Sequence, residues 1–332
     1  MQTSAVTHDN TLHPFADHAQ KEMVFQNTHI TLFKYTPQTV KCDTPVCISY
    51  ALVNKTYVLD LSPKNSFIRS LLKEGLIVYL IVWHDPAKTM CNVTLEDYVC
   101  RNLNICVDKV RQLHDIPQIN LLGICQGGTF SLMYTSLFGE KIKNLILMVT
   151  PVDFHSSENL FTHMAKTWDT KKIAGGFPLL TGDFMNMGFL QLKPCELLIN
   201  KYVGAVQFLN DEHKREFFLR MEKWIFDSPA QAGNTWSEFI EKCYQKNALV
   251  NDTFVLGGNK VSLSNIKCPV LNLTAAKDHL VPNECSTPLK NVISSTDYTY
   301  ESFSTGHIGI LVGRIVAKKV APTIGEWLQK RD

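Results

Sequence analysis

The chain has 332 residues, of which 45% are hydrophobic and 19% are charged, and its net charge is +2. This length suits one large α/β domain with an insertion, or two domains, and the composition is that of a globular protein with a sizeable core. The small net charge, with no extended basic run, argues against a nucleic-acid partner. The longest apolar run, 76–83, is too short to cross a bilayer, so no membrane span is expected.

The ten cysteines show no spacing that would hold a metal. There is no Cys-x-x-Cys pair and no His-x-x-x-His spacing, so we expect neither a metal nor another cofactor. Residues 1–22 are polar and do not resemble an export signal. A disulfide framework is not expected in a chain of this length without such a signal. Reduced thiols and a cytoplasmic location are therefore expected.

Strands and helices alternate after an N-terminal arm, residues 1–40, whose patterning is weak. Continuous apolar strands separated by helices are typical of a parallel sheet with crossover helices. The helix that precedes residue 119 has a possible capping box formed by Thr94 and Asp97. The predicted elements up to that point are a strand over 46–53, a helix over 66–73, a strand over 76–83 and a helix over 94–113.

A glycine-rich turn follows the next predicted strand, 119–124, and opens a helix. It reads Gly-Ile-Cys-Gln-Gly-Gly over 123–128, which matches the nucleophile elbow Gly-x-Ser-x-Gly with Cys125 in the serine position. Gly123 and Gly127 remove Cβ atoms where strand and helix pass close to the turn. The helix N-terminus would favour a thiolate at Cys125. Taken alone, the pattern also fits a small buried cysteine.

The pattern changes after a further predicted strand, 145–149. Residues 155–248 contain helical stretches and no convincing strand, which predicts a helical cap inserted into an α/β-hydrolase core made of 41–154 and 249–332. The central sheet is expected to be mostly parallel. The remaining predicted elements are cap helices over 158–168, 194–210, 211–226 and 235–247, strands over 269–274 and 298–303, and a closing helix over 310–330.

The last two predicted strands each end in a residue suited to catalysis. In α/β-hydrolases the acid and the histidine follow the nucleophile in that chain order. Asp278 and His307 occupy these two positions, so they are the candidate acid and base beside Cys125. His307 would take the thiol proton or pair with the thiolate, and Asp278 would orient the imidazole. Aspartate after a strand is often only a helix cap and a lone histidine is often structural, but finding both after an elbow favours a triad.

Two other histidines and two backbone amides are further candidates for the site. His279 is a competing base, although its position beside Asp278 should turn its side chain away from the pocket. His84 could line that pocket. The amide of Gln126 is the expected first donor of an oxyanion hole, and a second is expected in the loop near 49–51, with Ser49 as the candidate. A cysteine nucleophile gives an acyl thioester, which suits acyl transfer from a thioester substrate better than one-way hydrolysis.

Several longer motifs accompany the elbow. They are Tyr-Ala-Leu-Val-Asn at 50–54, Leu-Asp-Leu at 59–61, Thr-Pro-Val-Asp-Phe at 150–154, Phe-Asp-Ser-Pro at 226–229, Gln-Ala-Gly at 231–233, Lys-Asp-His at 277–279 and Gly-His-Ile-Gly at 306–309. Together with the elbow they make the chain resemble polyhydroxyalkanoate synthases, in particular the short class III catalytic subunit, with class IV close. The resemblance covers nearly the whole chain from about residue 40.

This resemblance implies a substrate and a reaction. An (R)-3-hydroxyacyl-CoA would acylate Cys125 and release CoA, and a hydroxyl-ended chain would then attack the next acyl group. Asp278 would also help to activate the 3-hydroxyl, and the cap would cover the cysteine and open. The resemblance further implies a second synthase subunit, a homo- or hetero-oligomer, and a place on polyester granules in the cytoplasm.

The sequence departs from the family at one strand end and leaves three interpretations. The family usually has Leu-Ile-Asp-Trp-Gly where this chain has Leu-Ile-Val-Trp-His over 80–84, so Val82 and His84 replace an aspartate and a glycine. The interpretations are a polyester synthase, a cysteine-based thioesterase or depolymerase, and a granule scaffold without activity. The complete set of Cys125, Asp278 and His307 argues against the scaffold, and cysteine at the elbow argues against the hydrolase.

Overall fold

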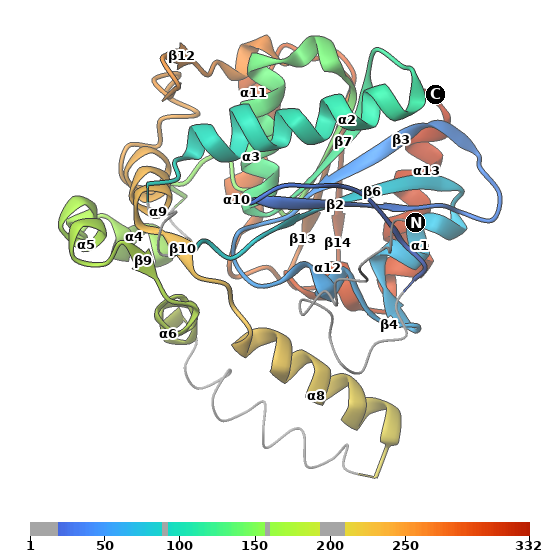
Figure 1. Cartoon of the computed structure of the whole chain (residues 1–332), viewed down its shortest axis with the longest axis horizontal. Coiled ribbons are helices and arrows are strands. Elements are labelled where there is room, and N and C mark those ends of the chain that lie inside the picture. Colours follow the sequence, from blue (N-terminus) through green and yellow to red (C-terminus); the bar gives the residue numbers. More distant parts are fainter. Residues whose placement is uncertain (1–18, 88–91, 157–159, 193–209) are drawn as a thin grey trace, which may run out of the picture.

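The computed structural model describes residues 19–87, 92–156, 160–192 and 210–332, and their centre is one eight-stranded sheet (Figure 1). The strand order is β1-β2-β6-β3-β7-β8-β13-β14. The strands β1, β2 and β6 pair antiparallel, and every later pairing is parallel. Their bounds are β1 Glu22–Gln26, β2 Ile30–Tyr35, β3 Cys42–Ser49, β6 Leu76–Trp83, β7 Ile119–Ile124, β8 Ile142–Met148, β13 Val270–Ala275 and β14 Tyr298–Phe303. The expected mostly parallel sheet is confirmed.

Helices cover both faces of this sheet (Figure 1). Successive residues of β6 show why: Val78 and Leu80 pack into the core layer under α1 and α13, whereas Tyr79 and Ile81 pack into the layer under α2 and α3. A strand buried on both faces has no polar side to alternate with, which explains its continuous apolar run. The helices are α1 Phe67–Lys73, α2 Asn104–His114, α3 Gln126–Leu137 and α13 Ala321–Gln329. A π-helical segment, Asp97–Leu103, leads into α2.

Helices gather beyond one end of the sheet in the segment between β8 and β13 (Figure 1). They are α4 Leu160–Ala165, α5 Thr170–Gly176, α6 Gly182–Leu192, α8 Glu212–Phe226 and α9 Gly233–Phe239, the last continued by a π-helical segment, Ile240–Gln245. We call this group the cap. The helix predicted over 194–210 lies almost entirely outside the described residues. The expectation of no strand was wrong in one place, because β9 Leu179–Leu180 pairs antiparallel with β10 Gln231–Ala232.

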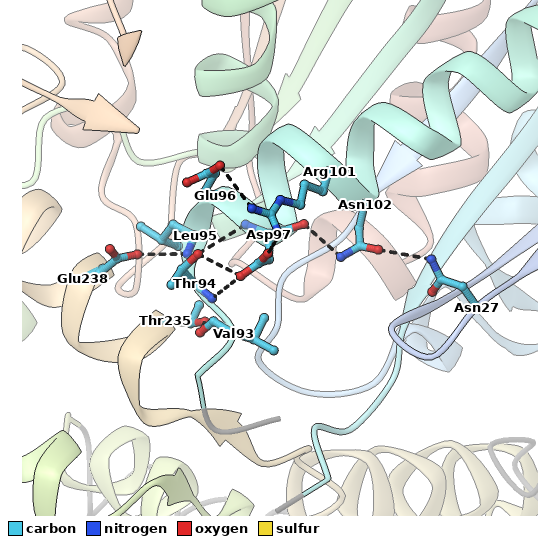
Figure 2. Close-up of polar contacts among 10 residues, drawn as sticks. All are labelled: Asn27, Val93, Thr94, Leu95, Glu96, Asp97, Arg101, Asn102, Thr235 and Glu238. Atoms are coloured by element: carbon cyan, nitrogen blue, oxygen red, sulfur yellow. Dashed lines mark hydrogen bonds and ion pairs between the residues drawn. The ribbon is translucent and has the colours of Figure 1, made fainter. Parts of the chain in front are cut away.

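The cap is tied to the core where the chain enters the helix that leads to α2 (Figure 2). From α9, the Thr235 hydroxyl donates to the Val93 carbonyl at 2.6 Å, and Glu238 accepts from the Leu95 amide at 2.9 Å. The predicted capping box is present: Asp97 accepts from the Thr94 amide at 2.9 Å, and the Asp97 amide donates to the Thr94 hydroxyl at 3.4 Å. One helix start therefore supports both the sheet domain and the cap.

Several sequence-based boundaries differ from the structure. The predicted strand over 46–53 is β3, which begins at Cys42 and ends at Ser49, because the chain then turns over the elbow. The closing helix is three pieces, α12 Gly309–Val312, a π-helical segment Val316–Val320 and α13, with Gly313 in extended conformation between the first two. Within the predicted arm, β1 and β2 join the sheet, so the core begins before residue 41.

Short elements complete the described chain. They are the 3-10 turns Thr56–Leu59, Gly139–Lys141 and Leu263–Asn265, the strands β4 Asp60–Ser62, β5 Asn65–Ser66, β11 Val255–Leu256 and β12 Asn259–Lys260, and the helices α10 Asn283–Ser286 and α11 Leu289–Val292. Three of the predicted strands, over 76–83, 119–124 and 298–303, coincide with β6, β7 and β14. The predicted helix over 66–73 is α1, with Ser66 as its N-cap.

Candidate active site

Cys125 lies between the end of β7 and the first turn of α3. Its backbone conformation is one that residues other than glycine rarely adopt. Its φ is 54° and its ψ is −124°. Hydrogen bonds hold this conformation: the Cys125 amide donates to the Met148 carbonyl at 2.9 Å, and the Gly128 amide donates to the Cys125 carbonyl at 2.9 Å. The thiol is partly exposed. Strain of this kind, held by surrounding bonds at a strand-to-helix turn, is the mark of a nucleophile elbow.

The elbow glycines are required by close backbone approach. A Cβ on Gly127 would lie 2.2 Å from the Ser49 carbonyl oxygen, at the end of β3. A Cβ on Gly123 would lie 2.4 Å from the Cα of Gly128. Both distances are far shorter than any van der Waals contact, so the strand, the helix and the neighbouring loop can meet here only without side chains. The predicted role of Gly123 and Gly127 is confirmed.

Asp278 and His307 follow β13 and β14 and contact each other. His307 Nδ1 lies 2.6 Å from Asp278 Oδ2. The other oxygen of Asp278 accepts from the amides of Leu280 and Val281, both at 2.9 Å, which fixes the carboxylate. The Asp278 side chain is 0% exposed and the imidazole 10% exposed. An ionised carboxylate only accepts, so Nδ1 carries a proton and Nε2 is left for another partner.

Cys125 acts on the same imidazole. Burial alone would lower the pKa of His307, but the charges of Asp278 and Cys125 and hydrogen bonds to both raise this pKa well above its ordinary value. The predicted acid and base therefore contact each other, and the charge of the elbow cysteine acts on the same histidine. A thiol beside an imidazole oriented by a carboxylate can be deprotonated to attack a carbonyl carbon.

The two other histidines considered from the sequence, His279 and His84, are not part of the Asp278–His307 pair. His279 is exposed, as expected from its position next to Asp278. His84 Nε2 lies 2.7 Å from the Thr31 hydroxyl, and with Val82 it lines a cavity of about 290 Å³. The described lining of this cavity includes Ala51 and Leu52 but none of the three triad candidates. The two departures from the family pattern thus share one cavity, beside the loop that follows β3.

The expected oxyanion donors lie on either side of the elbow. Gln126 is the first residue of α3, a position whose amide has no partner within the helix. Ser49 is the last residue of β3, opposite Gly123 in register, and its carbonyl faces Gly127. The loop 50–52 continues from it over the elbow. Neither the role of Ser49 nor that of Gln126 follows from the contacts alone, and both stay predictions.

Side chains from distant parts of the chain hold this loop, and the sequence did not predict these contacts. The Trp83 indole donates to the Tyr50 carbonyl at 2.9 Å, and the Leu52 amide donates to Oε1 of Gln126 at 3.0 Å. Gln231 belongs to a motif noted in the sequence, and its side chain donates to the Leu52 carbonyl at 3.4 Å. These contacts join residues 33 to 179 positions apart, so no local pattern could reveal them.

A cysteine elbow with a histidine and a carboxylate on the next strand ends defines an α/β-hydrolase-fold protein equipped for nucleophilic acyl chemistry. A family model for the alpha/beta hydrolase fold matches residues 84–313. Among solved structures, a monoacylglycerol lipase of Paleococcus ferrophilus is similar with a TM-score of 0.57 and 15% identity, covering 91% of this chain and 99% of that one. An esterase of Exiguobacterium antarcticum is similar with a TM-score of 0.54 and 16% identity, covering 92% and 98%. These likenesses establish the fold.

Sequence comparison identifies the family. A model for the poly-beta-hydroxybutyrate polymerase (PhaC) N-terminus matches residues 16–71. The chain is 44% identical to the poly(3-hydroxyalkanoate) polymerase subunit PhaC of Allochromatium vinosum, covering 94% of this chain and 88% of the relative. It is 43% identical to the protein of the same name from a Synechocystis strain, covering 94% and 85%. The chain belongs to the poly(3-hydroxyalkanoate) polymerase family and is thus an acyltransferase.

Two further properties concern the described residues alone. No group of three or more histidine, cysteine, aspartate or glutamate side chains there is placed to hold a metal ion. None of the described helices is long and apolar enough to cross a membrane.

Proposed function

We propose that this chain polymerises (R)-3-hydroxyacyl groups, delivered as CoA thioesters, into polyhydroxyalkanoate through a covalent acyl-cysteine at Cys125. One observation carries this proposal: in a member of the polymerase family, the elbow places a cysteine whose charge acts on His307, and His307 Nδ1 lies 2.6 Å from Asp278. The same geometry with a serine would serve a hydrolase. Cysteine makes the acyl-enzyme a thioester of nearly the same energy as the substrate, so transfer runs without a large loss of free energy.

The reaction proceeds in two acyl transfers. His307 Nε2 takes the proton from the Cys125 thiol, the thiolate attacks the thioester carbonyl, and the tetrahedral intermediate expels CoA, which leaves with the proton. The hydroxyl of another hydroxyacyl unit then attacks the Cys125 thioester, its proton passing to His307, and an ester bond replaces the thioester. Asp278 holds the imidazole in the required tautomer and, as the family resemblance implies, assists in activating the 3-hydroxyl.

Both tetrahedral intermediates carry a negative oxygen that needs donors. The Gln126 amide at the start of α3 is one, and an amide of the segment 49–51 supplies the other, with Ser49 as the original candidate. The close packing of Gly127 on the Ser49 carbonyl supports this arrangement, because it brings the loop within reach of the elbow. The positive end of the α3 dipole adds to the stabilisation of the oxyanion.

The product and partners follow from the same chemistry. A growing polyester is insoluble, so the enzyme works at the surface of its own product, on granules in the cytoplasm. The motifs of the chain resemble those of a class III catalytic subunit, which supports a second synthase subunit and an oligomeric assembly. No cofactor takes part, since CoA belongs to the substrate.

A cysteine hydrolase is the second candidate, favoured only by the lipase and esterase folds that the chain resembles. The deciding assay supplies 3-hydroxybutyryl-CoA to the purified chain, with and without a class III second subunit, and measures released CoA, insoluble polymer and free 3-hydroxybutyrate. We expect CoA release to match polymer formation. CoA release that yields only the free acid would contradict the synthase assignment and establish the hydrolase.

The nucleophile is tested with Cys125→Ala, which should abolish CoA release altogether. Another partly exposed thiol provides the matched control: Cys100→Ala, on the π-helical segment before α2, should keep normal turnover. Retention of activity by Cys125→Ala would exclude Cys125 as the covalent anchor.

A further inference from the structure

The loop that follows β3 is held from three sides by side chains of three separate elements. Trp83 at the end of β6 donates to the Tyr50 carbonyl at 2.9 Å. Gln126 in the first turn of α3 accepts from the Leu52 amide at 3.0 Å. Gln231 in β10 of the cap donates to the Leu52 carbonyl at 3.4 Å. Leu52 therefore has both of its backbone polar groups bound to glutamine side chains.

Both glutamines are buried, so their contacts are not exchanged readily for water. Gln126 is 7% exposed and Gln231 3% exposed. A buried amide that loses its acceptor keeps the full cost of desolvation, which makes the Leu52 contact with Gln126 hard to give up. The loop also packs directly on the elbow, where the Tyr50 carbonyl carbon would lie 2.6 Å from a Cβ on Gly127. The loop cannot shift without disturbing the elbow.

Gln126 thus acts at the elbow in two ways. Its backbone amide is the proposed first donor to the oxyanion, and its side chain fixes the loop that supplies the proposed second donor. One residue sets the spacing between the two donors. Spacing is decisive for such a hole, because donors must lie at about 3 Å from the position of the oxyanion, which the ground-state carbonyl oxygen does not occupy.

Gln231 brings the cap into the same arrangement. It pairs with Leu180 in the short β9–β10 ladder, and the next residues begin α9, which is anchored on the core through Thr235. Pro229 and Ala230, just before it, line the same cavity as Leu52. A cap seated on the core therefore presents the Gln231 amide to the loop, and a displaced cap withdraws it.

We propose that Gln126 is a positioning residue that sets the oxyanion loop through the Leu52 amide, and that Gln231 couples this loop to the seating of the cap. The proposal rests on the proposed acyl-cysteine chemistry at Cys125. It adds a function for two side chains that neither bind nor react with substrate. Acylation efficiency then depends on the cap even where the cap does not touch the thioester.

The test uses two reactions of the same thiol. Acyl transfer from 3-hydroxybutyryl-CoA develops an oxyanion, whereas alkylation of Cys125 by iodoacetamide displaces iodide without one. We expect Gln126→Met, which keeps the side-chain length but removes the acceptor, to lower kcat by about 10- to 100-fold with KM nearly unchanged. The alkylation rate of Cys125 should stay within about two-fold of the unmodified protein, because the thiol and His307 are untouched.

Gln118→Met is the matched control. It removes a glutamine whose side chain also bonds a backbone group, the Glu140 carbonyl at 3.1 Å, just before β7 and so at the opposite end of that strand from the elbow. Both rates should be normal in this variant. Equal loss of acyl transfer and alkylation in Gln126→Met would show that Gln126 merely maintains the elbow, and unchanged acyl transfer would equally overturn the proposal.

Gln231→Met tests the coupling to the cap from a residue outside the elbow, which guards against misfolding of the Gln126 variant. Its kcat should fall by a smaller factor, and the double variant should lose less than the product of the two single losses, because both act on Leu52. Multiplicative losses would exclude the shared loop. These outcomes can be told apart from failure of the proposed function. Whether polymer or free acid forms shows which reaction the enzyme catalyses, whereas the ratio of the acyl-transfer rate to the alkylation rate shows whether Gln126 positions the loop.

Discussion

At the scale of single residues, Cys125 owes its exposure to a conformation that the surrounding backbone enforces. The positive φ turns the side chain out of the strand, and the Met148 and Gly128 hydrogen bonds keep it there. The missing Cβ atoms of Gly123 and Gly127 let the strand, helix and loop close around it. These contacts turn the thiol toward the position of His307, and they require the glycines of the turn.

Asp278→Asn is expected to slow polymerisation on the order of 10³-fold, because the imidazole would lose both its orienting acceptor and its counter-charge. Burial, no longer opposed by the carboxylate, would lower the pKa of His307. Initial rates of CoA release give the first effect, and an NMR titration of the histidine ring protons gives the second. His279→Gln, at the exposed neighbour, should leave both unchanged. An unaltered His307 titration in Asp278→Asn would contradict the pairing.

The raised pKa of His307 also determines how folding stability changes with pH. The folded-state pKa of His307 lies above its value in the unfolded chain, near about 6.5. Protonated His307 therefore stabilises the fold fully below that unfolded value, and this contribution is lost as the pH rises through the folded-state pKa. The contact between Asp278 and His307 therefore also makes a contribution to folding stability that depends on pH.

At the scale of elements, α8 is held to the core by the loop that follows β3. The Asn54 side chain donates to the Trp224 and Ile225 carbonyls, both at 3.3 Å, and to the Ser228 hydroxyl at 2.9 Å. Carbonyls at the end of a helix lack partners within it, so Asn54 caps α8 from a distant part of the chain. Nearby, the Trp224 indole donates to the Lys55 carbonyl at 2.8 Å.

Asn54→Gly removes the contacts of the Asn54 side chain with the end of α8 without straining the backbone, because glycine readily adopts the φ of 59° that Asn54 has. Loss of the three hydrogen bonds should destabilise the attachment of α8 by about 1–3 kcal/mol. Amide hydrogen exchange should accelerate in 212–226 and stay unchanged in β7. Asn251→Gly, which removes an exposed asparagine whose side chain donates to the Lys246 carbonyl at 3.1 Å, is the control. Unchanged exchange in α8 would show that other contacts suffice to hold it.

At the scale of the whole molecule, the last residue of the chain is bound at the start of β3. Asp332 accepts from the Asp43 amide at 2.6 Å and from the Thr44 amide at 3.1 Å, at the start of β3. Lys143, in β8, lies 3.4 Å from the same carboxylate. Partial burial opposes ionisation, but hydrogen bonds from Thr44 and Asp43 outweigh it and lower the pKa of Asp332 to about 2.

This depressed pKa predicts a stability difference that depends on pH. Because the folded-state pKa lies below the unfolded value of about 3.9, the stabilisation is complete above that value and disappears as the pH falls through about 2. Asp332→Asn should cost about 1 kcal/mol at pH 6, after allowance for solvent screening, and less at pH 3. Urea unfolding at the two pH values measures this, with Asp43→Asn as the exposed control. A cost that is equal at both pH values would contradict the contact.

The parts of the fold that the sequence predicted are those with a local cause. The bounds of β6 and β7 were predicted because strands buried in a parallel sheet read as unbroken apolar runs. The bounds of β14 were also predicted, although this strand contains polar residues and is mostly only partly buried. The closing helix was predicted too long, because its apolar spacing continues across Gly313 although the backbone does not. The strands β1 and β2 were missed, since β1 has several exposed positions and its pairing with β2 joins residues that local periodicity cannot relate.

The sequence by itself determined the chemistry: a cysteine in a glycine-lined elbow, with an aspartate and a histidine at later strand ends, because each of these signals lies within a few residues. The tertiary structure alone decided what surrounds it. The contacts of Gln126 and Gln231 with Leu52, and of Asn54 with α8, join positions 74 to 179 residues apart. Hydrogen bonds between such distant residues depend on how the strands order and the cap packs, and no stretch of the chain records that order.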